Sequence, residues 1–261
     1  MRGSVCLLFA AVLAWPLGAV AQVQPHHAQY ILRLGPAPNA PRIGTATQDL
    51  TADCSGWHLK RDISTEIAIT QSWKMSVGSR LDGEEQRGGN AFRYRLAQIQ
   101  NGNEREVRGR VQHAGKETHA EIVWPDGPQQ LILPGMTMMP VSAISHMIAR
   151  LREGVDAFPA LTFDAEVVGD AFLVDVEQLD AGSIRPRRPV DAKITPPGRS
   201  WPVHMSFTRG SRQDQKPLFA VNTLVYESGV LDRLTVDTGL VNVTADLQSL
   251  KMYDPPSCPR S

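Results

Sequence analysis

The sequence predicts a mainly β protein that is built from antiparallel strands and contains one amphipathic helix. Short segments in which apolar and polar residues alternate recur along most of the chain. Dipeptides that are typical of tight turns separate these segments. Only one longer segment has apolar residues at helical spacing.

The alternating segments place apolar side chains on one face of each predicted strand and polar side chains on the other. The segments lie at residues 30–34, 92–96, 172–177, 203–207 and 241–247. Hairpin ends are predicted at Asp82-Gly83, Asn101-Gly102, Asp126-Gly127, Gly169-Asp170 and Ser228-Gly229. Proline-rich stretches mark longer connections, and no repeat of fixed period is visible. We therefore expect one continuous architecture.

The predicted helix covers about residues 141–153. Pro140 stands where a first helical turn tolerates proline, and Gly154 stands where a left-handed cap ends a helix. The apolar stripe consists of Val141, Ile144, Met147, Ile148 and Leu151. We expect this helix to plug a curved sheet, and the alternative is a lid over a lipid pocket.

The first residues have the features of a secretory signal peptide. Arg2 precedes a short apolar run, and Ala19 and Ala21 are the small residues of a cleavage site. No Arg-Arg pair precedes the run, which favours the general export route over the twin-arginine route. We therefore expect residues 1–21 to be cleaved, residues 22–28 to be a flexible leader and residues 29–261 to form a single β-rich domain. No transmembrane segment is expected after cleavage.

Cleavage would remove Cys6 and leave Cys54 and Cys258 as a pair. In an exported chain such a pair is expected to be oxidised, because the compartment outside the cytoplasm does not keep thiols reduced. The disulfide would close a loop of about 205 residues. A redox-active pair is the weaker alternative, since no Cys-x-x-Cys motif is present.

Composition and motifs exclude several functional classes. The 261 residues include 27 Lys+Arg and 27 Asp+Glu, and this balance argues against a dedicated nucleic-acid binder. The sequence contains no nucleophile elbow, zinc-protease motif, phosphate-binding loop or calcium loop. We therefore expect a protein that is not an enzyme, with no catalytic residue, metal site or cofactor.

A few side chains remain as candidates for ligand or partner contact. His146 lies opposite the apolar stripe of the predicted helix and close to Arg150. We interpret this face as solvated, and the alternative is a histidine that faces a ligand or partner. The acidic pair Glu84-Glu85 is interpreted as solvated. The basic loop 185–189 could contact anionic head groups or peptidoglycan, although such clusters more often serve solubility.

Several stretches together resemble the alphaproteobacterial cell envelope integrity protein EipB family. The resemblance rests on the order of these stretches across nearly the whole mature chain: residues 28–34, Cys54-Ser55-Gly56-Trp57, residues 82–94, 133–154, 226–237 and 247–258. It implies a periplasmic antiparallel β-spiral or incompletely closed barrel with a Cys54–Cys258 disulfide. It also implies a role in envelope integrity and stress resistance. Trp57, within the matching cysteine segment, joins His146 and Arg150 as a candidate contact residue.

Three functional hypotheses follow. The first is a noncatalytic periplasmic protein that maintains the envelope by binding a protein partner or an envelope lipid or peptidoglycan component. The second is a carrier of lipid or lipoprotein acyl chains, with an apolar cavity under the helix. The third and weakest is a cell-wall hydrolase of unfamiliar type.

Overall fold

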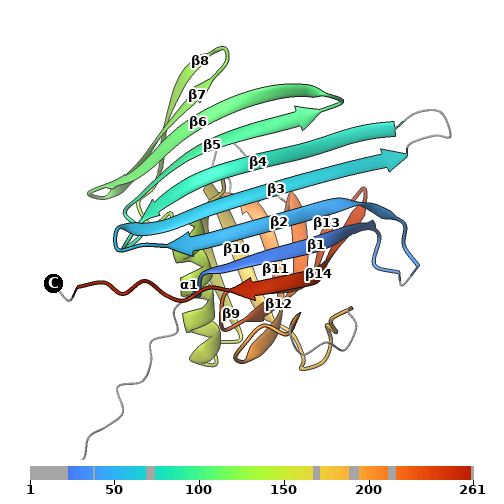
Figure 1. The fold of residues 1–261 in the computed structure, drawn as a ribbon. Helices are drawn as coiled ribbons and strands as arrows, with labels where there is room; N and C mark the ends of the chain where they lie inside the picture. The colour runs from blue at the N-terminus through green and yellow to red at the C-terminus, as the bar shows by residue number, and fades with distance from the viewer. Residues whose placement is uncertain are drawn as a thin grey trace, which may run out of the picture.

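In the part of the chain that the structure describes, the strands form one open antiparallel sheet and are accompanied by a single helix (Figure 1). The computed structural model describes residues 23–37, 39–68, 74–166, 171–187, 194–210 and 216–259. The elements are β1 His26–Leu34, β2 Arg42–Ala52, β3 Gly56–Ala68, β4 Lys74–Gln86, β5 Ala91–Gln100, β6 Asn103–Ala114, β7 Glu117–Trp124, β8 Gly127–Pro134, α1 Pro140–Arg152, β9 Ala157–Phe163, β10 Ala171–Gln178, β11 Ser200–Arg209, β12 Phe219–Tyr226, β13 Leu231–Asp237 and β14 Asn242–Met252.

The strand order explains why the sheet does not close. From one edge to the other the order is β8-β7-β6-β5-β4-β3-β2-β1-β14-β13-β12-β11-β10-β9. The first and last strands of the chain pair in the middle of this sheet, and β8 and β9 are its two edges. The strands β2–β8 cross over the strands β9–β13 in Figure 1, with α1 at one end. The predicted antiparallel, incompletely closed sheet with one helix is confirmed.

Strand β5 shows how the alternating pattern builds the core. Phe92, Tyr94 and Leu96 are buried, whereas the arginines between them are exposed. The rings of Phe92 and Tyr94 stack with centroids 5.5 Å apart. Phe163 on β9 lies 5.8 Å from the Tyr94 ring. The aromatic side chains of β5 thus pack against β9, which belongs to the other half of the sheet.

Glycines on the neighbouring strands make room for these rings. A Cβ atom at Gly83 would lie 2.6 Å from Phe92 Cε2, and one at Gly109 would lie 2.3 Å from Tyr94 Cε1. Asp82-Gly83 was predicted as a turn, and this prediction is wrong because both residues lie inside β4. Its glycine serves close packing between strands instead.

The other predicted turns are mostly found. Asn101-Gly102 connects β5 to β6, and Ser228-Gly229 connects β12 to β13. Asp126-Gly127 lies at the β7–β8 turn. Gly169-Asp170 lies outside the described residues.

The first strand begins earlier in the sequence than predicted. We expected residues 22–28 to be a flexible leader, but β1 begins at His26, and Val23 is buried. The reason is that β1 is an inner strand, so that His26 pairs with Leu50 on one side and Met252 on the other. Burial lowers the pKa of His26, whose Nδ1 lies 2.8 Å from the Gln24 carbonyl oxygen.

The helix forms where its apolar stripe predicts, within one residue at each end. Its buried side chains are Val141, Met147, Ile148 and Leu151, and Ile144 packs against the same core. Pro140 opens the helix, and Gly154, with φ of +76°, follows its end.

An ionic cluster around the buried Asp246 connects the central strands to a loop. Asp246 on β14 is 1% exposed and forms an ion pair with Arg233 of β13. Its other oxygen lies 3.6 Å from Arg33 Nε and 4.0 Å from an Arg187 nitrogen. The cluster therefore joins β1, β13, β14 and the loop that contains Arg187.

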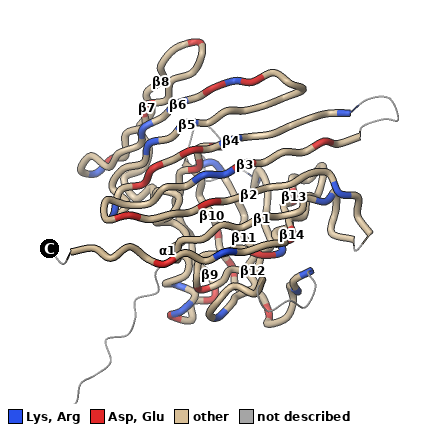
Figure 2. The backbone as a smooth tube through the Cα atoms, viewed as in Figure 1, with Lys and Arg blue, Asp and Glu red and all other residues tan. Residues whose placement is uncertain are grey.

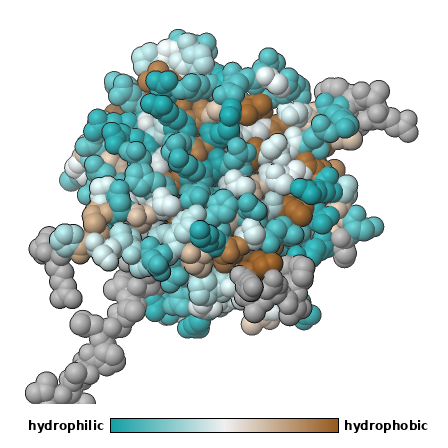
Figure 3. Space-filling model, viewed as in Figure 1, coloured by the Kyte–Doolittle hydropathy of each residue, from teal (hydrophilic) through white to brown (hydrophobic). Residues whose placement is uncertain are grey.

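The described strands carry charges of both signs. Basic and acidic residues alternate over the strands in Figure 2. The face seen in Figure 3 is mainly hydrophilic, with small and separate hydrophobic areas. Within the described residues, no helix has the length and apolar character that spanning a membrane requires.

Candidate functional site

The disulfide ties the C-terminal segment to the turn between β2 and β3. Cys54 and Cys258 are 204 positions apart in the sequence, and their Cα atoms lie 5.5 Å apart. The predicted Cys54–Cys258 bond is therefore present. Its closure of so long a loop restricts the unfolded chain strongly.

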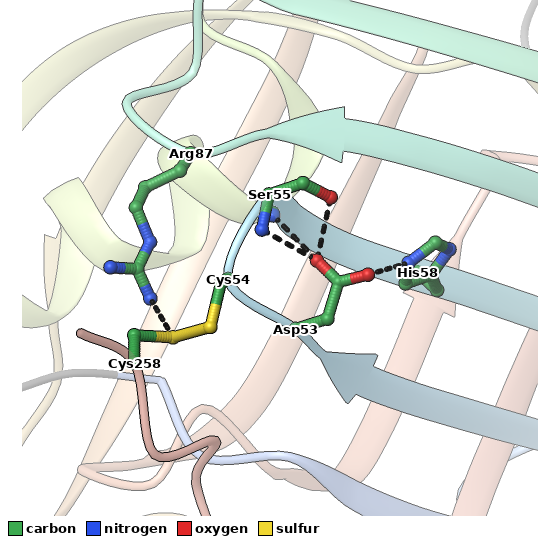
Figure 4. The surroundings of a disulfide bond; sticks show 7 residues. Asp53, Cys54, Ser55, His58, Arg87 and Cys258 are labelled. Carbon is green, nitrogen blue, oxygen red and sulfur yellow. Dashed lines mark hydrogen bonds and ion pairs between the residues drawn. A yellow bond between two sulfur atoms is a disulfide. The ribbon is translucent and has the colours of Figure 1, made fainter.

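Asp53 organises the turn that presents Cys54 (Figure 4). Its Oδ1 accepts hydrogen bonds from the Ser55 backbone at 2.7 Å, the Ser55 hydroxyl at 2.6 Å and the Gly56 backbone at 3.0 Å. His58 Nε2 lies 3.0 Å from the other oxygen. Hydrogen bonds from Ser55 and His58 lower the pKa of Asp53. The carboxylate of Asp53 thus connects Ser55, Gly56 and His58 around the turn.

A cavity of about 660 Å³, which we call the disulfide-side cavity, lies beside this turn. It is lined by the segment before β1, the β2–β3 and β4–β5 turns, one face of α1, the segment before β11, the β12–β13 turn and the C-terminal segment. Its charged lining residues are Asp53, Arg87, Arg152 and Glu227. This volume falls in the range of roughly 300–1,000 Å³ that is common for ligand pockets. The mixed lining fits a polar ligand or a polar partner segment better than a hydrocarbon chain.

An ion pair and a hydrogen bond connect the cavity walls. Arg152 Nε at the end of α1 lies 3.1 Å from Glu227 Oε1 of the β12–β13 turn. Arg87 donates a hydrogen bond of 3.4 Å to Cys258 Sγ (Figure 4). These contacts connect the helix and the C-terminal segment to opposite parts of the sheet.

Glu85 holds the N-terminus of α1 at this cavity. Its carboxylate accepts hydrogen bonds from the Val141 backbone at 2.7 Å, the Ser142 backbone at 2.9 Å and the Ser142 hydroxyl at 2.5 Å. The helix has no side-chain cap of its own and no acidic residue in its first turn. A strand residue therefore supplies the acceptor and the negative charge that a helix N-terminus favours.

The interpretation of Glu85 as a solvated residue is wrong. Its side chain is 3% exposed, and burial raises the pKa of its carboxyl. Glu84 is exposed as expected and forms an ion pair with Arg93 at 2.7 Å. Alternation along β4 carries the signal that was missed, because Leu81, Gly83 and Glu85 point to the same face of the strand.

The three candidate contact residues do not share one site. Trp57 lines the cavity and packs partly against the core. His146 instead packs edge-on against Phe158, with ring centroids 6.0 Å apart. Arg150 lies over the same ring at 5.9 Å and pairs with Glu153 at 2.7 Å. Of the candidates, only Trp57 belongs to the disulfide-side cavity.

A second cavity bears on the acyl-chain hypothesis. It lies between α1 and the sheet, has a volume of about 180 Å³ and is lined mainly by apolar side chains, among them Ile144, Met147, Phe163 and Met205. Arg61 and Asp164 also line it. An apolar cavity under the helix was expected for a carrier, but this one is smaller than the roughly 300–1,000 Å³ of common ligand pockets.

The structure also bears on metal binding. In the ranges that the structure describes, no three His, Cys, Asp or Glu side chains gather in a way that could hold a metal ion.

Known proteins share this architecture. "Cell envelope integrity protein EipB" of Brucella abortus (strain 2308) is 22% identical over 245 residues, which cover 90% of this chain and 86% of that protein. A crystal structure from Brucella abortus, described as a beta-barrel-like protein of a domain of unknown function, matches with a TM-score of 0.76 and 20% identity. The match covers 89% of this chain and 99% of that one. The EipB-like family model matches residues 17–254, and the chain therefore belongs to the EipB-like family.

Proposed function

We propose that the protein is a noncatalytic periplasmic factor that maintains the integrity of the bacterial cell envelope and its resistance to stress. Membership of the EipB-like family and the name of the Brucella abortus relative support the envelope role. The signal-peptide features of residues 1–21 and the disulfide support export to an oxidising compartment.

The disulfide-side cavity is the proposed binding site for a protein partner or a polar envelope component. The observation that carries this proposal is the construction of its walls. Segments far apart in sequence are brought together there by the disulfide, the Glu85 cap and the Arg152–Glu227 ion pair. Trp57 adds an aromatic surface, and Arg87 and Arg152 add cationic groups. Such a combination suits a ligand with polar or anionic groups.

A deletion strain tests the envelope role. We expect the strain to be more sensitive than wild type to detergent and to cell-wall antibiotics, and a gene for the unaltered protein should restore growth. Equal growth of the deletion strain and wild type under these stresses would refute the proposed role.

A filled cavity tests the proposed site. Ser145 lines the cavity on α1, and Ser145→Trp would occupy part of its volume. Ser183 is exposed and outside the cavity lining, so Ser183→Trp is the matched control. We expect Ser145→Trp to fail to restore growth at equal protein level and equal melting temperature, and Ser183→Trp to restore it. Full restoration by both variants would exclude the cavity as the working site.

A further inference from the structure

The two edges of the sheet differ in how they are covered. The edge strand β9 is bridged by the segment before α1, since Met138 N–H donates to the Leu161 carbonyl at 2.8 Å and Phe163 N–H donates to the Met138 carbonyl at 2.9 Å. The other edge strand, β8, pairs with β7 alone among the strands that the structure describes (Figure 1). One edge is therefore covered by the chain itself over part of its length, and the other presents free backbone groups.

The register of β7 and β8 identifies these groups. A two-residue turn joins Trp124 to Gly127, which makes them a hydrogen-bonded pair, and the ladder continues without irregularity to Pro134. Hydrogen-bonded pairs alternate along the ladder, so the backbones of residues 128, 130, 132 and 134 face away from β7. Pro128 and Pro134 are both among the residues whose backbone faces away from β7, where a missing N–H group removes no hydrogen bond between β7 and β8.

The free edge between the two prolines is short and well defined. Its donors are the N–H groups of Gln130 and Ile132, and its acceptors are the carbonyls of Pro128, Gln130 and Ile132. The Pro134 carbonyl already accepts a hydrogen bond from Thr137 at 3.0 Å. Beside these groups, Ile132 is 68% exposed and Met136 is 81% exposed. The free backbone and the exposed apolar side chains thus occur together.

We propose that the β8 edge, residues 128–134, binds a short extended segment of a partner protein, which adds to the sheet as a further strand. Free N–H and carbonyl groups at strand spacing select an extended polypeptide backbone. The two flanking prolines limit the added strand to a few residues. Ile132 and Met136 favour an apolar side chain in the partner segment next to them.

A partner protein fits this edge better than a second copy of the chain. If two β8 strands paired with Gln130 opposite Ile132, Pro128 would face Pro134 of the other copy, and the Pro128 carbonyl would lack a donor. A segment without proline can satisfy every free group. The edge shares no lining residue with the disulfide-side cavity, so this proposal stands apart from the proposed use of that cavity.

Cross-linking with proline variants tests the proposal. A photo-cross-linking residue in place of Met136 should form an adduct with a different protein in cells of the native host. Gln130→Pro removes one outward donor and keeps the ladder to β7, whereas the control Gln130→Ala keeps that donor. We expect Gln130→Pro to reduce the adduct by about tenfold and Gln130→Ala by no more than about twofold. Ile132→Pro should act like Gln130→Pro.

Several results would overturn the proposal. These are the absence of an adduct, an equal loss with Gln130→Pro and Gln130→Ala, no loss with either, or an adduct that consists of two copies of this chain. Amide hydrogen exchange of the purified protein gives a second measurement that needs no folded proline variant. Gln130 and Ile132 should exchange fast, and Gln129 and Leu131 slowly, because only the latter two donate to β7. Slow exchange of Gln130 and Ile132 would show that the edge is already covered.

Discussion

Removal of the Glu85 carboxylate should destabilise the protein through the helix that it caps. In Glu85→Ala, the Val141 N–H group loses its acceptor in a buried position, and the Ser142 N–H group and hydroxyl lose theirs in a partly buried one. A hydrogen bond to a charged group contributes about 1.5–3 kcal/mol, and relief of the buried charge offsets part of the sum, so we expect a loss of about 3 kcal/mol. For a domain of this size that corresponds to a melting temperature lower by about 6–12 °C.

Glu84 provides the matched control, because it is the adjacent residue and its carboxylate is exposed. Its ion pair with Arg93 lies at the surface, so Glu84→Ala should change the unfolding free energy by less than about 0.5 kcal/mol. Urea unfolding followed by tryptophan fluorescence, together with thermal melting, measures both variants. Equal destabilisation by Glu84→Ala and Glu85→Ala would refute the capping role of Glu85.

The same residue predicts a pH dependence. Burial raises the pKa of Glu85 in the folded protein above the ordinary value of 4.5. The folded state therefore holds this proton more tightly than the unfolded state, and the associated stability is complete below pH 4.5 and is lost as the pH rises through the raised pKa. The stability of the unaltered protein relative to Glu85→Gln should fall over this pH range. A difference that grows with rising pH would contradict the burial effect.

Three further predictions concern the Cys54–Cys258 disulfide, the packing around Tyr94 and the buried carboxylate of Asp246. Cys54→Ser or Cys258→Ser should change mobility on nonreducing gels and lower the unfolding free energy by up to about 5 kcal/mol, and melting curves equal to those of the unaltered protein would contradict this. Gly109→Ala would place a Cβ atom 2.3 Å from the Tyr94 ring, and urea unfolding should show a loss of about 1–3 kcal/mol, whereas an unchanged midpoint would show that the ring moves freely. Asp246→Asn removes the anion among Arg33, Arg187 and Arg233 and should cost about 3 kcal/mol in the same assay, with a change below 1 kcal/mol counting against the cluster.

Patterns that depend on one strand or one helix could be predicted from the sequence. The alternation of Phe92, Tyr94 and Leu96 with arginines is a property of β5 alone, and the stripe of α1 is a property of the helix alone. The disulfide could also be predicted, because two cysteines in an exported chain allow one pairing.

Features that depend on long-range pairing could not be predicted. From the sequence of β4 alone, Glu85 is interpreted as solvated. Its partner Val141 on α1 follows 56 residues later in the chain, and only the packing of α1 against β4 buries the carboxylate. Asp82-Gly83 looks like a turn until Gly83 is seen to accommodate the Phe92 ring of the next strand. His26 looks like part of a leader until β14, more than two hundred positions away, supplies its pairing partner. The cavity itself has no sequence signature, since its walls come from both ends of the chain.

The end of β4 connects the parts of the proposed site. Glu85 fixes the start of α1, and Arg87, two residues later, contacts Cys258 in the C-terminal segment. The helix side and the tail side of the cavity are therefore positioned by the same short stretch, but by different interactions. Reduction of the disulfide should release the tail, while the hydrogen bonds of Glu85 to Val141 and Ser142 do not involve the sulfur atoms. The cavity is thus expected to lose one wall on reduction and to keep the helix in place, so a ligand that contacts Pro255 or Pro256 would lose affinity while one held by Trp57 and Ser145 would not.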